Sequence, residues 1–550
     1  MDYKKMAAAF AAGGAVLAAG AAYTMKQKNN NRQPNVHFSS GGGRKVYLSD
    51  TSLASLAVAA YLIRDYNFDG ENIHIFQKEN FMGGGCSLGV EDGALLSSNL
   101  LLHEQGCPDF FELFRSIPAL SAGGVSVKKE IVQFYQAHPM KPMLILHASD
   151  GTERVLSKKD HRLLERLILT SENKLEKVSI YQWFDENTSF FQSDFWMRLR
   201  TLFGLKESSS AASLRQILLW RNDELKSLST MKGWMSLPAH PAYSLIKPLY
   251  SYLKGYGVHF YKGAEIEDVL FSDTYNLRAR MIVVNDGKKR RQIELNGDDL
   301  CVCVLGSSFS DACFGSLNKP CGECSKQEGL WNRLASHRSE LNVPGQLLEP
   351  KNGAEGSFVF TFKEGILYQY LSEYMGNLNE REGLICLADT NWGITLDIHS
   401  SSSFPGQAGG VMSGTIVYPY EQGDHIRKTF DSCSGEEILE EILQHLGCTE
   451  LKTVIQKDCI KATSCLMPNA YAAKLAENEA VLHSPKLNDS NFAVLSPYRK
   501  TKSCCWLEHQ VTQARTVVTS LMQTVQEGRV QKAKNLKQQT VALRFLRQVS

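Results

Sequence analysis

The sequence predicts an α/β protein built on a doubly wound parallel sheet. Residues 44–85 hold a short apolar strand (KVYLS), a helix of small residues (SLASLAVAAYLIRDY) and a second strand (NIHIF), which is the order of a βαβ unit. Further along, the apolar run CVCVLGSS ends at Gly306 and Ser307, as a buried parallel strand does where it meets a ligand crevice. At 550 residues the chain is too long for one core, so about two to four subdomains are expected.

Composition narrows the class of protein. A hydrophobic content of 43% and a charged content of 21% describe an ordinary globular protein. A formal net charge of +2 gives no overall attraction to nucleic acid, so none is expected as a partner. The fourteen cysteines are scattered through apolar and helical stretches, which predicts free thiols in a reducing compartment. Cys321 and Cys324 form a CxxC pair with Cys313 upstream, but no second pair accompanies them, so a loop with two ordinary thiols is favoured over a metal or redox site.

The N-terminal residues 1–43 are expected to lie apart from the folded body. Twenty uncharged residues, 6–25, are long enough to span a bilayer but consist mostly of Ala and Gly. We favour a weak membrane anchor, with a cleavable signal peptide as the alternative and with the body of the protein in the cytoplasm. Residues 27–43 are then a flexible tether.

Helices and strands are expected to alternate along the body. Helical periodicity is found in 158–170 and 212–228, and the aromatic residues of 188–203 repeat at helical spacing. Such a stripe is typical of a core, and a lipid-facing channel is the alternative. GVHFY and ARMIVV are predicted strands, with VNDGKK as a hairpin turn. Residues 434–447 are predicted to form a helix capped by Ser434 and ended by Gly447.

The C-terminal residues 523–550 form a basic tail. From position 528 onward there are six basic residues and no acidic one, and Val541, Phe545 and Val549 fall on one helical face. A basic amphipathic helix of this kind predicts contact with an anionic membrane surface. A solvated helix end is the alternative.

Several segments together resemble one family, the FAD-dependent fatty acid (oleate) hydratases, also called the myosin-cross-reactive antigen family. The matching stretches follow the family's order over most of residues 45–520. They are LASLAVAAYLIRDYNFDGENIHI, FFELFRSIPAL, DFWMRLRTLF, YSLIKPLYSYLKGYGVHF, DDLCVCVLGSS, DTNWGITL, CSGEEILEEILQHLG and CLMP.

The resemblance implies a division into domains and a ligand. A discontinuous Rossmann-type FAD domain would comprise 44–130, 243–320 and 485–522, with a helical cap at 131–242 and a substrate-binding α+β domain at 321–484. An apolar tunnel would hold a free unsaturated fatty acid, and a Glu and a Tyr would add water across its cis-9 double bond. FAD would organise the site without net redox change. The resemblance also implies membrane association, and it leaves a homodimer open.

The cofactor positions depart from the family's pattern. The expected Gly-x-Gly-x-x-Ser falls on Asp50, Ser52 and Ser55, so only the last residue is kept. A carboxylate about 5 Å from a phosphate charge costs roughly 3 kcal/mol at an effective dielectric near 20, or about a hundredfold in affinity. The acidic residue that would hold the ribose falls on Gln77, and Ser496 and Pro497 stand where the family places a glycine-containing strand end. The candidate cofactor contacts that remain are Ser52, Ser55, Glu79, Gly83, Gly84, Gly306 and Ser307.

The catalytic positions depart as well. The family's Glu falls on Leu102 and its Tyr on Ala242, and neither residue transfers a proton. Glu104 and Tyr243 are the nearest substitutes. We therefore expect a degenerate member that binds unsaturated fatty acid without efficient catalysis. An active FAD-dependent hydratase and a membrane-tethered interaction scaffold are the alternatives.

Overall fold

The computed structural model describes most of the chain between residues 43 and 523. The described residues are 43–78, 82–84, 101–121, 123–147, 152–185, 189–272, 277–307, 309, 311–324, 329–341, 353–363, 365–374, 383–399, 409–470, 490–498 and 505–523. The expected N-terminal anchor, the basic tail beyond 523 and Glu79 lie outside them. None of the helices in the described ranges combines the length and apolarity needed to cross a bilayer.

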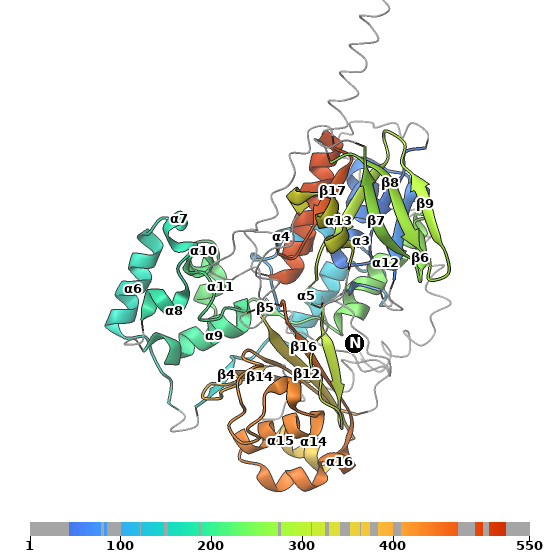
Figure 1. The fold of residues 1–550 in the computed structure, drawn as a ribbon. Helices are drawn as coiled ribbons and strands as arrows, with labels where there is room; N and C mark the ends of the chain where they lie inside the picture. Colours follow the sequence, from blue (N-terminus) through green and yellow to red (C-terminus); the bar gives the residue numbers. More distant parts are fainter. Residues whose placement is uncertain are drawn as a thin grey trace, which may run out of the picture.

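A five-stranded parallel sheet forms the centre of one half of the molecule (Figure 1). Its strand order is β17-β10-β1-β2-β6. The strands are β1 (Val46–Leu48), β2 (Ile73–Gln77), β6 (His259–Lys262), β10 (Leu300–Val304) and β17 (Phe492–Leu495). The sheet is therefore assembled from segments far apart in the sequence. The predicted βαβ unit, the buried strand ending before Gly306 and the discontinuous parallel sheet are confirmed.

Both faces of this sheet are covered. Val46 and Leu48 point to a core shared with α3 (Leu53–Tyr66), α4 (Pro108–Phe114), α5 (Val127–Ala137), α12 (Lys247–Gly255) and the helix 506–523. The alternate residue Tyr47 points to the other face, where β7 (Glu265–Phe271), β8 (Ala279–Asn285), β9 (Arg290–Glu294) and α13 (Leu330–His337) pack. The predicted hairpin is confirmed as the β8–β9 pair. Because one covering layer is an antiparallel sheet, the parallel sheet is flanked by helices on one side and by strands with a helix on the other.

A seven-stranded mixed sheet forms the second half, in the order β11-β16-β12-β15-β14-β13-β4. Its strands are β4 (Leu144–Leu146), β11 (Cys313–Ser316), β12 (Glu355–Phe362), β13 (Leu384–Leu387), β14 (Ile394–His399), β15 (Val411–Ile416) and β16 (Cys459–Met467). One face packs on α14 (Ile366–Tyr374), α15 (Gly435–His445) and α16 (Ile455–Asp458) through an apolar core. The opposite face carries polar side chains that are buried, among them Thr395 and Ser413.

A helical lobe stands beside this sheet (Figure 1). It contains α6 (Lys158–Leu169), α7 (Glu172–Leu175), α8 (Ile180–Phe184), α9 (Asp194–Phe203), α10 (Ala211–Trp220) and α11 (Asn222–Lys226). Phe190 and Trp196 are fully buried in its core, so the aromatic stripe is a core stripe, as predicted. The single helix expected over 212–228 is instead two helices, because the chain leaves helical geometry at Arg221 (φ −112°, ψ 36°). A two-stranded ladder, β3 (Leu102–His103) with β5 (Trp234–Met235), lies outside both sheets.

Local capping explains where α15 begins and ends. Ser434 accepts a hydrogen bond from the Glu437 N–H, and the Glu437 side chain accepts one from the Ser434 N–H, which together form a capping box. Gly447 follows the helix with φ +70°, a left-handed conformation that glycine adopts without a Cβ penalty. Both predicted ends of this helix are confirmed.

Candidate functional site

The turn between β1 and α3 is the position where a parallel α/β sheet binds phosphate groups. Here the Oδ1 atom of Asp50 accepts three hydrogen bonds, from the Ser52 N–H (3.1 Å), the Ser52 Oγ (2.8 Å) and the Ser55 Oγ (2.6 Å). Ser52 is the N-cap of α3, and its Oγ accepts a hydrogen bond from the Ser55 N–H (3.3 Å). The donors at this helix N-terminus are therefore directed at a side chain of the same turn.

Two opposing effects act on the Asp50 carboxyl group. Burial raises its pKa, and the hydrogen bonds from Ser55 and Ser52 lower it, with burial the larger effect. In either protonation state Oδ1 remains an acceptor for the three donors. The candidate contacts Ser52 and Ser55 are thus brought together by Asp50.

The other predicted cofactor contacts lie around the same edge of the sheet. Gly83 N–H donates to the Thr51 carbonyl (2.9 Å), and a Cβ on Gly84 would lie 3.5 Å from the Ser52 Cβ, so this pair of glycines packs on the β1–α3 turn. Gly306 and Ser307 follow β10. Gln77, at the last position of β2, is 3% exposed and places a neutral amide where the family's ribose-binding acid is expected.

The position of the family's catalytic Glu lies in a buried strand. Leu102 is fully buried in β3 and pairs with Met235 of β5. Glu104 follows the strand with its side chain 58% exposed, and its carboxylate lies 2.8 Å from the Lys128 Nζ. The structure therefore places Glu104 at the surface in an ion pair, two residues beyond a buried Leu102.

Tyr243 lies in a helical turn of unusual geometry. Residues Ala242–Ile246 form a π-helical turn before α12, a rare conformation that is frequent at functional sites. Tyr243 is half-buried, burial raises its pKa, and the Lys247 Nζ lies 3.8 Å from the centre of its ring. The Tyr243 ring therefore faces a cation of the following helix.

A cluster on the polar face of the seven-stranded sheet was missed by the sequence-based reasoning. The His399 Nε2 lies 3.0 Å from the Ser413 Oγ and 3.5 Å from the Asp397 Oδ2. Burial raises the pKa of Asp397 to about 7, and its Oδ1 is buried without a hydrogen-bond partner in the described part of the chain. The sequence does place Asp397 and His399 on one face of a strand, because alternate residues of a strand share a face. Their pairing with Ser413 depends on the sheet register, which the sequence does not show.

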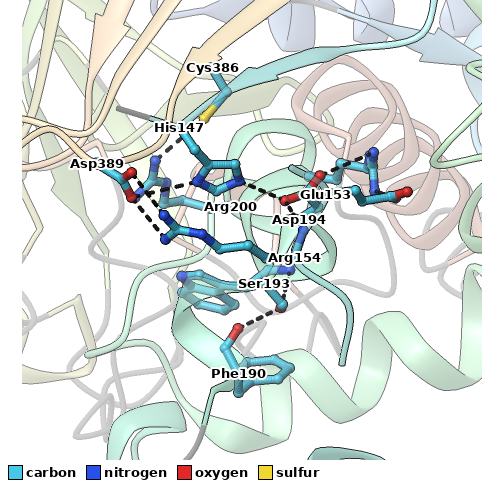
Figure 2. A network of polar contacts seen from close by, with 11 residues as sticks. His147, Glu153, Arg154, Phe190, Ser193, Asp194, Arg200, Cys386 and Asp389 are labelled. Atoms are coloured by element: carbon cyan, nitrogen blue, oxygen red, sulfur yellow. Dashed lines mark hydrogen bonds and ion pairs between the residues drawn. The ribbon is translucent and has the colours of Figure 1, made fainter. Parts of the chain in front are cut away.

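A second missed network joins the helical lobe to this sheet (Figure 2). The His147 Nε2 lies 2.8 Å from the Asp194 Oδ1, and Arg154 forms two hydrogen bonds of 3.1 Å with the Asp389 carboxylate. Arg200 donates to the Cys386 Sγ at 3.5 Å. These residues come from the loop after β4, from α9, from β13 and from the loop that follows β13. They therefore link the lobe to the edge of the sheet.

Asp424, Glu441 and His445 could each offer a metal ligand, with candidate atoms all within 4.8 Å of one another. The Glu441 carboxylate already accepts the N–H groups of Asp424, His425 and Ile426. Although burial raises the pKa of Glu441, His445 and these N–H groups outweigh it and lower the pKa. These hydrogen bonds hold the loop before α15 against that helix, and this structural role explains the cluster without a metal ion.

The cysteine prediction needs one correction. Cys313 and Cys324 form a disulfide, so the expectation of free thiols and of two ordinary thiols in the CxxC pair is wrong at these positions. The bond joins β11 to the loop that follows it. Sequence spacing alone did not show the pairing, because it requires the loop to fold back on its own strand. Cys321 remains a free thiol beside the Ser464 Oγ (3.3 Å).

The parallel sheet with its phosphate-position turn, joined to a mixed sheet and a helical lobe, defines an α/β protein. The crystal structure of an oxidoreductase from Methanosarcina mazei is similar, with a TM-score of 0.50, 13% identity and coverage of 86% of this chain and 100% of that one. The chain itself belongs to the MCRA family, whose model matches residues 43–518.

Two relatives are similar in sequence. An oleate hydratase from Streptococcus pyogenes serotype M49 is 26% identical over 450 residues, which cover 77% of this chain and 75% of the relative. A linoleate hydratase from Lactiplantibacillus plantarum is 23% identical over 450 residues, covering 73% and 78%. The resemblance inferred from the motifs is thereby confirmed.

The residues at the β1–α3 turn do not fit the FAD that this resemblance implies. A pyrophosphate needs donors at the helix N-terminus, and Asp50 already accepts the Ser52 N–H and the hydroxyl groups of Ser52 and Ser55. It also needs glycines that let the backbone approach, and Asp50 and Ser52 carry side chains there.

Proposed function

We propose that this protein is a fatty-acid-binding member of the MCRA family that has lost efficient hydration. The ligand class follows from its relatives, an oleate hydratase and a linoleate hydratase, which point to a free unsaturated fatty acid. We further propose that residues 523–550 contact an anionic membrane surface, and that the protein is membrane-associated with its body in the cytoplasm.

The observation that carries the loss of hydration is the burial of Leu102. Protonation of an alkene requires a positioned acid, and a leucine within a strand has no proton to give. Glu104 lies at the surface with its side chain 58% exposed and in an ion pair with Lys128, two residues beyond the buried Leu102. Ala242 at the family's Tyr position supports the same conclusion.

Two measurements on the purified full-length protein test this proposal. Extracted lipids are identified by mass spectrometry, and incubation with oleate, with and without added FAD, is followed by gas chromatography for 10-hydroxystearate. We expect retained unsaturated fatty acid and no hydroxy product. Variants E104Q and Y243F should retain as much fatty acid as the wild type.

The alternatives give different outcomes. Formation of 10-hydroxystearate by the wild type and its loss in E104Q or Y243F would establish an active hydratase that uses the neighbouring residues. Failure to retain or bind any fatty acid would leave the interaction scaffold, which is the third possibility.

A further inference from the structure

The carboxyl ends of β1, β10 and β17 meet at one edge of the parallel sheet. The strand order reverses between β1 and β10, since β2 lies on one side of β1 and β10 on the other. Ligands of doubly wound sheets bind at such a reversal. We propose that the chain's own side chains permanently close this edge, with the Asp50 carboxyl group standing in the place of the phosphate.

The β1 end supplies the first element of the closure. The helix α3 has 14 residues, and its N-terminus presents one N–H and two hydroxyl donors toward a single point. Asp50 Oδ1 occupies that point and accepts all three at 2.6–3.1 Å. A phosphate would have to displace this side chain before it gained any of the donors. An internal acceptor needs no association, so it has the entropic advantage over a free ligand.

The β17 end is closed by a glutamine from the C-terminal helix. Gln513 Oε1 accepts the Ser496 N–H (3.0 Å), and Gln513 Nε2 donates to the Ser496 carbonyl (2.7 Å). Both backbone groups that follow β17 are thereby satisfied within the chain. Ser496 is 3% exposed, so its surface is not available to the ring of a flavin.

The β10 end is closed by two aromatic rings. Gly306 has φ +79°, and a Cβ built there would lie 2.5 Å from the Tyr498 Cε2 and 2.7 Å from the Trp331 Cζ3. The two rings stack on each other with centroids 6.0 Å apart. The Tyr498 hydroxyl donates to the Ser307 carbonyl at 2.7 Å. The space that the absent Cβ of Gly306 leaves is therefore filled by protein.

Among the described residues, all three strand ends thus have internal partners, which satisfy the polar groups named above without a nucleotide. The proposal is independent of the fatty acid proposal above, because neither the closure nor its test involves lipid. A hydratase that worked without flavin would still show a closed edge.

The test compares variants of the full-length protein by thermal unfolding and by titration with inorganic pyrophosphate, ADP and FAD. D50G removes the internal acceptor, and D50N keeps an acceptor oxygen while removing the charge. D69G is a matched control. Asp69 also caps a helix, by accepting the Glu71 N–H (3.2 Å), but it precedes β2 and therefore lies at the edge of the sheet opposite to Asp50.

We expect D50G to have a lower Tm than the wild type and to bind pyrophosphate at least about tenfold more tightly. The wild type, D50N and D69G should show no rise in Tm with any of the three probes. If D50G does not fold, D50A takes its place in the same titration.

Three results would overturn the proposal. The wild type could purify with stoichiometric flavin, which means that the edge is open. D50N could bind pyrophosphate as strongly as D50G, which would mean that charge repulsion, and not the occupied donors, keeps pyrophosphate from binding to the wild type. The glycine or alanine variant could gain no affinity, which means that Asp50 does not hold the site.

Discussion

A single carboxyl group on the polar face of the seven-stranded sheet shows how burial governs chemistry at the residue scale. Asp397 has its ordinary pKa of 3.8 raised to about 7 by burial alone, although His399 lies within 3.5 Å. The folded protein therefore keeps a proton on Asp397 at pH values where the unfolded chain has lost it. This contribution to stability is fully present below about pH 4 and is lost as the pH rises through 7.

The variant D397N should remove this pH dependence. We expect the free energy of unfolding of D397N, relative to wild type, to increase between pH 4 and pH 8 by up to about 4 kcal/mol. Urea denaturation at several pH values measures the difference. An equal pH slope in both proteins would contradict the prediction, and D298N serves as control, because Asp298 is an exposed residue.

At the scale of elements, the edge strand β11 is held by more than its ladder. Cys313 on β11 and Cys324 in the following loop are joined by a disulfide across a sequence separation of 11. Closing a loop of this length restricts the unfolded chain and stabilises the fold by about 3 kcal/mol in the chain-entropy model. The loop also packs against the apolar core beneath the sheet.

Replacement of both cysteines in C313A/C324A should therefore lower the free energy of unfolding by about 2–3 kcal/mol. Chemical denaturation measures the loss, and peptide mapping without reductant identifies the linked pair in the wild type. The control C321A leaves the disulfide intact and should cost less. If reductant leaves the wild-type unfolding curve unchanged while C321A alters it, the assignment of the pair is wrong.

At the scale of the whole molecule, the polar network of Figure 2 decides how the helical lobe attaches to the mixed sheet. Asp194 begins α9 and accepts hydrogen bonds from His147 and from the Arg154 N–H, and it lies 3.8 Å from Arg198. The lobe's apolar core also includes Leu384 and Cys386 of β13. Apolar packing and a partly buried polar network therefore act at the same boundary.

The variant D194A should leave the buried His147 ring without its acceptor and cost about 1–3 kcal/mol. The expected signs are a lower denaturation midpoint and faster proteolysis between the lobe and the sheet. The matched control D223A breaks a pair with Lys226 whose side chains are 56% and 66% exposed, and should cost less than about 1 kcal/mol. Equal losses in the two variants would show that the network does not secure the lobe.

The sequence by itself determined the parts of this protein that depend on local order. Hydrophobic periodicity located β1, α3, β2 and β10, and the capping residue Ser434 with Gly447 set the ends of α15. The motifs together identified the family, and comparison with the family's glycine pattern showed the substitution at Asp50. These features rest on neighbours within a few residues, which the sequence displays directly.

Only the tertiary structure decided what residues distant in sequence do to one another. The match to the family's pattern placed a carboxylate near the phosphate position, but the fold directed the donors of Ser52 and Ser55 at Asp50 and set Gln513 against Ser496. The Cys313–Cys324 bond and the Asp397–His399–Ser413 cluster likewise depend on loop closure and sheet register. The physical reason is that hydrogen bonds and burial are properties of positions in space, and chain order does not specify which distant groups share a position.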